Sequence, residues 1–183
     1  MSVDYSEKIL TVKDLEVQFN LRGQVLTAIR GISLDIYKGE SLAIVGESGS
    51  GKSVFTKTFM GMLDKNGKVT KGEILYNGMD LAKFSSEKDW LKIRGKEVAM
   101  VFQDPMTSLN PLKTVGKQIQ EALELHQNLH GRAARERTIE ILSDVGITEP
   151  ERRYKQYPHE FSGGMRQRAV IATAIACNPN ILI

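Results

Sequence analysis

One octapeptide constrains the fold of this chain more than any other feature. Gly46, Glu47, Ser48, Gly49, Ser50, Gly51, Lys52 and Ser53 fit the pattern G-x-x-x-x-G-K-[ST]. Glycines let the backbone curl so that successive N–H groups point inward at an anion. The lysine brings a mobile positive charge to the β- and γ-phosphates, and the serine hydroxyl can ligate Mg²⁺. The octapeptide therefore predicts a phosphate loop that binds a nucleoside triphosphate.

The residues on either side of the octapeptide supply the expected context. Residues 41–46 form a continuous apolar run, which is typical of a parallel strand covered on both faces. A helix is expected from Lys52 to about Leu63, and its N-terminal dipole would favour a phosphate. Residues 97–103 predict a second buried strand of the same type.

Other segments have the alternation of antiparallel strands. Residues 9–19 place Leu15, Val17 and Phe19 on one face, and residues 32–36 repeat the alternation. Residues 72–78 predict a short strand that closes in an Asn-Gly turn. Together with the phosphate loop, these segments predict an α/β fold: a P-loop NTPase (RecA-like) core with an antiparallel β subdomain.

The pattern changes after Asp104-Pro105, where apolar residues recur at helical spacing. Helices are expected over 114–130 and 132–145, with Gly146 as C-cap, and over 163–177. We therefore expect three parts: residues 1–103 with the β subdomain and the first part of the core, an all-helical insertion over 104–160, and 161–183 with a last helix and the start of a strand.

The amino-acid composition excludes several classes of protein. Apolar residues are 41% and charged residues 26%, which excludes collagen-like, low-complexity and disordered chains. The net charge of +3 is too small to indicate a strongly basic, nucleic-acid-binding surface. The single cysteine can form no internal disulfide. No signal peptide or membrane span is expected. Because residues 180–183 stop within an apolar run, we expect a C-terminally truncated chain, with a short edge strand as the alternative.

A second constellation opens the last predicted helix. Ser162 is a good N-cap, but Gly163 and Gly164 are poor helix formers, each costing about 1 kcal/mol relative to alanine. That local cost indicates that an anion approaches the backbone closely at this helix start. A loop that needs glycine only to turn is the alternative.

With the phosphate loop, this segment resembles the ABC-transporter ATPases, whose signature reads Leu-Ser-Gly-Gly-Gln. Phe161 and Met165 replace the leucine and the glutamine, while the serine and both glycines are kept. Gln103 matches the family's Q-loop glutamine, and it lies 58 positions before Phe161. Residues 102–111 and 157–168 are similar to the ATPase subunits of bacterial oligopeptide and dipeptide importers. Nickel and glutathione importers of the same branch stay open as alternatives.

The resemblance implies ATP and Mg²⁺ as ligands, with Gln103 near the Mg²⁺ and the attacking water. It implies a head-to-tail pair of ATPase subunits, each ATP lying between one phosphate loop and the other subunit's Ser162-Gly163-Gly164. It further implies two membrane-spanning permease subunits as partners, an extracellular peptide-binding protein indirectly, no nucleic acid, and a peripheral place at the cytoplasmic face of the membrane. The resemblance also makes Phe19 the aromatic that stacks on adenine, although Phe19 could equally serve the core.

The family's Walker B carboxylates and switch histidine follow an apolar strand, and residues 180–183 resemble the start of that strand. We therefore expect the 183-residue chain to bind ATP but to hydrolyse it poorly. A nucleic-acid maintenance ATPase of the same superfamily would carry a far longer insertion before the signature, and a simple phosphotransferase would leave Gln103 and the signature unexplained.

Overall fold

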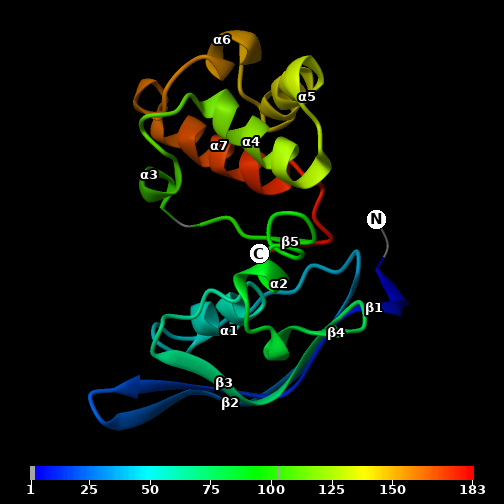
Figure 1. Cartoon of the computed structure of the whole chain (residues 1–183), viewed down its shortest axis with the longest axis vertical. Coiled ribbons are helices and arrows are strands. Elements are labelled where there is room, and N and C mark those ends of the chain that lie inside the picture. The colour runs from blue at the N-terminus through cyan, green and yellow to red at the C-terminus, as the bar shows by residue number, and fades with distance from the viewer. Residues whose placement is uncertain (1–2, 103) are drawn as a thin grey trace. The chain divides into compact units, whose positions relative to one another are not determined.

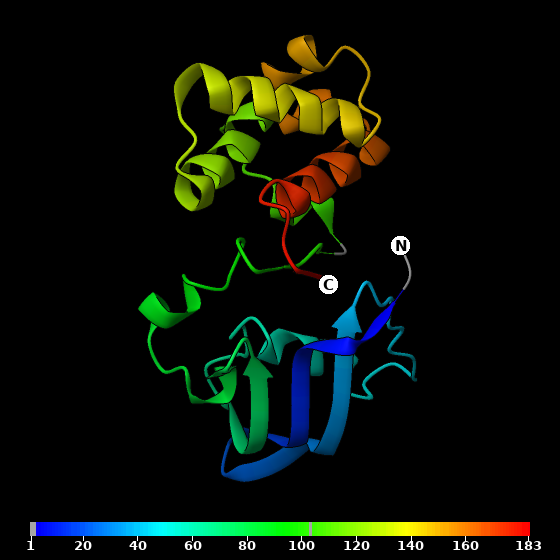
Figure 2. The same ribbon diagram turned by 90° about the vertical axis from the view of Figure 1, so that its right-hand side faces the viewer.

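The computed structural model describes residues 3–102 and 104–183, which form two compact units, Met1–Trp90 and Leu91–Ile183. Figures 1 and 2 show the elements of each unit. Each unit has its own architecture. The three-part division expected from the sequence stays a prediction.

The first unit is built on an antiparallel sheet in the order β2-β1-β3-β4 (Figure 1). Its strands are β1 (Asp4–Leu21), β2 (Gln24–Lys38), β3 (Gly67–Tyr76) and β4 (Met79–Asp80). Three short helices complete the unit: α1 (Lys52–Thr58), the 3-10 helix η1 (Leu81–Lys83) and α2 (Glu87–Trp90). The antiparallel strands predicted from alternation are confirmed, and each of them is longer than its sequence pattern.

A β-bulge keeps the apolar face of β1 turned to the core. Leu10 and Val12 are buried, and burial resumes at Leu15 and Val17 after a shift in register. The extra residue, Asp14, has a φ of 45°. Phe19, expected on the same face, is only half-buried. The bulge thus changes which residues of the alternation face inward.

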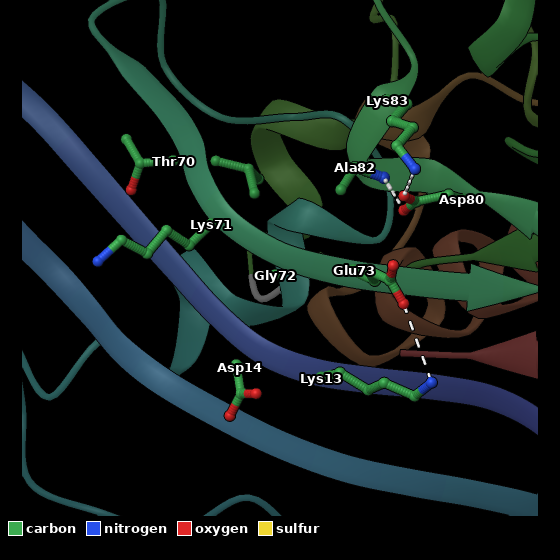
Figure 3. Close-up of a pocket in the computed structure, with 10 residues that line it drawn as sticks. Lys13, Asp14, Thr70, Lys71, Gly72, Glu73, Asp80, Ala82 and Lys83 are labelled. Carbon is green, nitrogen blue, oxygen red and sulfur yellow. Dashed lines mark hydrogen bonds and ion pairs between the residues drawn. The ribbon is translucent and has the colours of Figure 1, made fainter.

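Gly72 on β3 lies against this bulge. Its φ is +90°, and an added Cβ would come within 2.4 Å of the Lys13 carbonyl oxygen. Beside it lies a hollow of about 540 Å³ that contains the Lys13–Glu73 and Asp80–Lys83 ion pairs (Figure 3). No residue of the predicted nucleotide site lines this hollow.

Asp80 caps η1 at the edge of this hollow. Its Oδ1 accepts the N–H groups of Ile74 and Ala82, each at 3.1 Å, and its Oδ2 lies 2.9 Å from Lys83 Nζ. Burial by itself would raise the pKa of Asp80, but the Lys83 ammonium and the two N–H donors hold it below its ordinary value. This carboxylate is therefore a structural cap whose charge is satisfied.

The prediction of a buried strand over residues 41–46 is wrong for this structure. The segment has no strand assignment, and its side chains are exposed, Val45 to 87%. A parallel strand exists only where a neighbour supplies backbone hydrogen bonds, and no described residue pairs with this segment in a ladder. The helix that follows the loop also ends early, at Thr58 instead of about Leu63.

The second unit combines helices with one pair of parallel strands, β5 (Val98–Ala99) and β6 (Ile181–Leu182). Its helices are α3 (Pro105–Ser108), α4 (Val115–Gln127), α5 (Gly131–Asp144), α6 (Pro150–Tyr154), η2 (Pro158–Glu160) and α7 (Gly163–Ile175). Of the strand predicted over 97–103, the part within the described residues 97–102 is a strand at Val98–Ala99, and Gln103 lies outside the described residues. A strand at the end of the printed sequence is confirmed.

The helices predicted over 114–130, 132–145 and 163–177 are present as α4, α5 and α7, whereas the shorter α3, α6 and η2 were not predicted. Val115, Ile119 and Leu123 of α4 are fully buried, and Ile141 and Leu142 of α5 join them in one core. Gly146 follows α5 with a φ of +76°, which confirms its predicted role at the helix end. Within the described part of the chain, no helix is long and apolar enough to cross a membrane.

Candidate functional site

The phosphate loop lies in the first unit, between β2 and α1. Gly51 is the N-cap of α1 with a φ of +91°, and an added Cβ would lie 2.9 Å from Ile29 Cδ1 and 3.0 Å from the Ala28 carbonyl oxygen. Both the left-handed backbone and the close approach of β2 require glycine here. At Gly46, a Cβ would come within 2.8 Å of Ser50 Oγ. The loop is therefore tightly curled: Gly51 is required by the backbone, whereas a side chain at Gly46 would need Ser50 to rotate away.

Lys52 places its positive charge on this curled loop. Its Nζ donates hydrogen bonds to the carbonyl oxygens of Gly46 at 2.8 Å and Glu47 at 2.6 Å, and lies 3.3 Å from Ser50 Oγ. A turn hydrogen bond from Ser50 N to Glu47 O, at 3.2 Å, closes the loop beneath it. The side chain of Ser53 is exposed in the first turn of α1. The cation and the hydroxyl thus lie on consecutive residues at one helix start.

The donor set of this loop fits Mg²⁺-ATP. Mg²⁺ keeps several waters and binds phosphate oxygens with one or two protein oxygens, so a single exposed hydroxyl at Ser53 suits it. Among the described residues, no cluster of three or more His, Cys, Asp and Glu side chains could hold a metal by itself. Gln103, the other predicted magnesium contact, lies outside the described residues.

Phe19 and the loop are connected through β2. Phe19 pairs with Leu26 of β2, and its ring covers Gly67, where an added Cβ would come within 2.5 Å. Ala28, which contacts Gly51, lies two residues beyond Leu26, about 7 Å along the strand. Strand β2 therefore pairs with the strand that carries Phe19 and also contacts the phosphate loop at Gly51.

The Ser-Gly-Gly segment opens α7 in the second unit. Ser162 is the N-cap, and its Oγ accepts the Met165 N–H at 3.3 Å, as the sequence predicted. Gly163 and Gly164 have ordinary negative φ values, and no atom lies within 4 Å of an added Cβ at either position. Neither the turn of the chain nor its own packing requires glycine here. The exposed backbone is therefore open to a group from outside the unit.

Other residues considered from the sequence have structural roles. Trp90 and Cys177 are buried, and burial raises the pKa of the Cys177 thiol. His126 lies half-buried on α4, where burial and then the nearby Lys96 charge lower its pKa. Arg166, by contrast, was not identified from the sequence. Its Nε donates to the Pro158 carbonyl oxygen at 2.8 Å, across a loop whose path no local pattern predicts.

Fold and site together are those of a P-loop NTPase. Residues 29–183 match the ABC transporter family model, and the chain belongs to this family. It is 55% identical over 175 residues to the oligopeptide transport ATP-binding protein AmiE of Streptococcus pneumoniae, which covers 96% of this chain and 49% of that protein. It is 53% identical over 178 residues to the dipeptide transport ATP-binding protein DppD of Bacillus subtilis, which covers 97% of this chain and 53% of that protein.

Solved structures agree with this assignment. The dimeric ATP-binding cassette MJ0796, in a post-hydrolysis state bound to ADP and phosphate, superposes with a TM-score of 0.81 at 30% identity. The match covers 94% of this chain and 72% of that one. The cassette cbiO1 from Clostridium perfringens, part of the cbiONQ transporter complex, gives a TM-score of 0.74 at 28% identity, over 96% of this chain and 64% of that one. The chain spans about half the length of the curated relatives it matches.

Proposed function

We propose that this chain is the ATP-binding, energy-coupling part of an importer for peptides. The relatives named for oligopeptide and dipeptide transport, at 53–55% identity over nearly the whole chain, support peptides as the cargo over nickel or glutathione. ATP hydrolysis by the intact subunit would drive uptake. Substrate choice then belongs to the permease subunits and the peptide-binding protein, because no peptide site is needed in the ATPase.

One observation carries the proposal: two glycines at the start of α7 have no role in the chain's own packing. A phosphate group that approaches this helix start would need their bare backbone, and the helix dipole would favour its negative charge. The phosphate loop lies in the other unit and already has its own lysine. The simplest arrangement is a head-to-tail pair, in which Ser162-Gly163-Gly164 of one subunit closes on the ATP held by the partner's loop.

Residue roles follow from that arrangement. The loop amides of 46–51 and the Lys52 ammonium would hold the phosphates, and Ser53 together with Gln103 would hold Mg²⁺. Phe19 would stack on the adenine. Lys52 and Gln103 would then contribute to phosphoryl transfer by charge stabilisation and by orienting the metal and water region, since positioning and electrostatics supply most of this catalysis.

The helical insertion offers a place for the permease subunits. A groove of about 510 Å³ lies between the start of α4 and the segment before α7, and it is lined by Leu112, Lys113, Gln120, Tyr154 and Tyr157, among others. Leu112 is 86% exposed at its rim. A cytoplasmic segment of a permease subunit that covers this leucine would hold the ATPase at the inner membrane face as a peripheral protein.

For the 183-residue polypeptide, we expect ATP hydrolysis at or near background. By the resemblance, β6 would be the strand after which this family places its catalytic carboxylates, and no acidic residue follows Asn180 in the printed sequence. Phosphate release during incubation with Mg²⁺-ATP measures this directly. Release at a rate of about 1 s⁻¹ or more, within the ordinary range of enzyme turnover, would contradict it.

Head-to-tail pairing is tested by complementation. Lys52→Ala removes the phosphate-binding cation but keeps the signature. Gly163→Asp keeps the loop but sets a carboxylate where the phosphate would lie. Aspartate in the first turn is favourable to a helix and meets no atom here, so the fold is expected to survive. We expect neither variant alone to associate in Mg²⁺-ATP, whereas an equimolar mixture does, because one intact composite site is restored.

Sedimentation velocity with and without Mg²⁺-ATP provides the measurement. The unsubstituted chain serves as the positive control, and each variant's far-UV circular dichroism as the control for folding. A mixture that stays monomeric while the unsubstituted chain associates would overturn the shared site. Association of the Gly163→Asp variant alone would show that the signature does not take part.

A further inference from the structure

We infer that Arg166 is the positioning residue for the signature segment: it ties the start of α7 to the preceding loop and so holds Ser162-Gly163-Gly164 where a partner's nucleotide can meet them. This inference rests on the proposed head-to-tail function. It adds a residue that contacts no phosphate itself and acts through the backbone it holds.

The contact joins two ends of a short loop. Arg166 Nε donates to the Pro158 carbonyl oxygen at 2.8 Å, eight residues earlier in the chain, and Arg166 N donates to the Ser162 carbonyl oxygen at 2.9 Å. The side chain is half-buried, so its hydrogen bond is partly shielded from water. A charged donor forms a shorter and stronger bond than a neutral one. Arg166 therefore closes a ring that contains the whole of the signature segment.

The rest of this ring is held at both ends. Glu160 accepts the Tyr157 N–H at 2.7 Å through its carboxylate and donates its own N–H to the Tyr157 carbonyl oxygen at 3.0 Å. Phe161 is buried in the core of the second unit. Ser162, Gly163 and Gly164 are all exposed. Ser162 accepts the Met165 and Arg166 N–H groups from the first turn of the same helix, and the two glycines have the widest backbone freedom. The Arg166 bond spans the part of the ring that would otherwise move most.

Arg168 on the same helix provides a natural comparison. Its Nη1 donates to the Gly146 carbonyl oxygen at 2.8 Å, which ties α7 to the end of α5 instead of to the signature loop. Arg168 is exposed where Arg166 is half-buried. Each arginine thus donates a hydrogen bond to a backbone carbonyl, and the Pro158 carbonyl belongs to the ring whereas the Gly146 carbonyl does not. Replacing either removes the same charge from α7.

The test compares Arg166→Gln, Arg166→Lys and Arg168→Gln in the 183-residue chain, with Mg²⁺-ATP as the probe. We expect Arg166→Gln to bind ATP at the phosphate loop within about twofold of the unsubstituted chain, while ATP-driven association weakens about tenfold or more, as loss of a charged hydrogen bond predicts. Arg166→Lys should recover part of the association. Arg168→Gln should associate as the unsubstituted chain does.

Complementation separates positioning from a general loss of structure. Arg166→Gln should associate when mixed with Lys52→Ala, which has an intact signature, and not when mixed with Gly163→Asp. Exchange of the Met165 amide, which donates to Ser162, should accelerate in Arg166→Gln but not in Arg168→Gln, as measured by hydrogen–deuterium exchange.

The outcomes distinguish this inference from the function on which it rests. Association of Arg166→Gln at the unsubstituted level, alongside loss in Gly163→Asp, would overturn the inference and leave the shared site standing. Failure of Lys52→Ala and Gly163→Asp to complement would overturn the shared site itself, and the positioning role with it. Equal loss in Arg166→Gln and Arg168→Gln would assign the effect to charge on α7 and would likewise overturn the inference.

Discussion

Lys52→Ala is expected to weaken Mg²⁺-ATP binding to the 183-residue chain by about 100-fold or more. The Lys52 ammonium lies 2.8 and 2.6 Å from two carbonyl oxygens of the loop, so its charge is already at the loop. Bound phosphates would take over those donors. Each charged hydrogen bond contributes about 1.5–3 kcal/mol, and two such bonds correspond to a factor of about 10² or more in affinity.

The fold should tolerate this substitution. Gly46 and Glu47 are exposed, so water can hydrogen-bond the two carbonyl groups that Lys52 releases. Lys57→Ala is the matched control, because Lys57 lies on the same helix but in its last turn, away from the loop. Isothermal titration calorimetry measures both. Equal affinity of Lys52→Ala and the unsubstituted chain would show that ATP binds elsewhere or that the loop does not act as a phosphate site.

Local chemistry explains which parts of the site could be predicted. The loop glycines and the Ser162 cap depend on backbone turns over four to eight residues, so the residue types that they need lie close together in the sequence. The Ser162–Met165 hydrogen bond was expected and is present. Helix α4 was likewise predicted, because the apolar spacing of Val115, Ile119 and Leu123 is itself a local property.

Strand predictions failed where they depended on distant partners. Residues 41–46 have the composition of a buried strand, yet they have no strand assignment, and among residues 97–102 the strand is confined to Val98–Ala99. A helix satisfies its backbone within one segment, whereas a strand needs another segment beside it. An apolar run therefore shows that a segment could form a buried strand, but it does not show whether a second segment lies beside it to pair with. The same reasoning explains why the Arg166–Pro158 contact gave no sequence signal.

The shift in register within β1 could not be predicted from the sequence either. The alternation Leu15, Val17, Phe19 correctly predicted a strand, but nothing in it indicated the bulge at Asp14 that separates Val12 from Leu15. A bulge is stabilised by the strand opposite, here through Gly72 of β3. The sequence placed Gly72 at the start of the strand predicted over 72–78, and its contact with β1 becomes apparent only when the two strands are paired.

Gly72→Ala is expected to destabilise the first unit by about 3 kcal/mol. An alanine would have to adopt a φ of +90°, which costs an L-residue about 1–2 kcal/mol. Its Cβ would also lie 2.4 Å from the Lys13 carbonyl oxygen and 2.7 Å from the Asp14 carbonyl carbon. Both are backbone atoms, so no side chain can rotate away, and forced displacement costs about 1–3 kcal/mol more. The close contact of Gly72 with β1 can be followed in Figure 3.

Gly78→Ala separates the two contributions. Gly78 has a φ of +76°, but no atom lies within 4 Å of an added Cβ, so only the conformational cost of about 1–2 kcal/mol remains. Urea unfolding followed by the fluorescence of Trp90, the chain's one tryptophan, compares the two variants within the same unit. Equal losses would mean that β1 yields at the bulge and that Gly72 is required only for its backbone angle. A clearly larger loss of unfolding free energy for Gly72→Ala than for Gly78→Ala would show that the bulge is rigid. The register of the β1–β3 pair would then depend on position 72 having no Cβ.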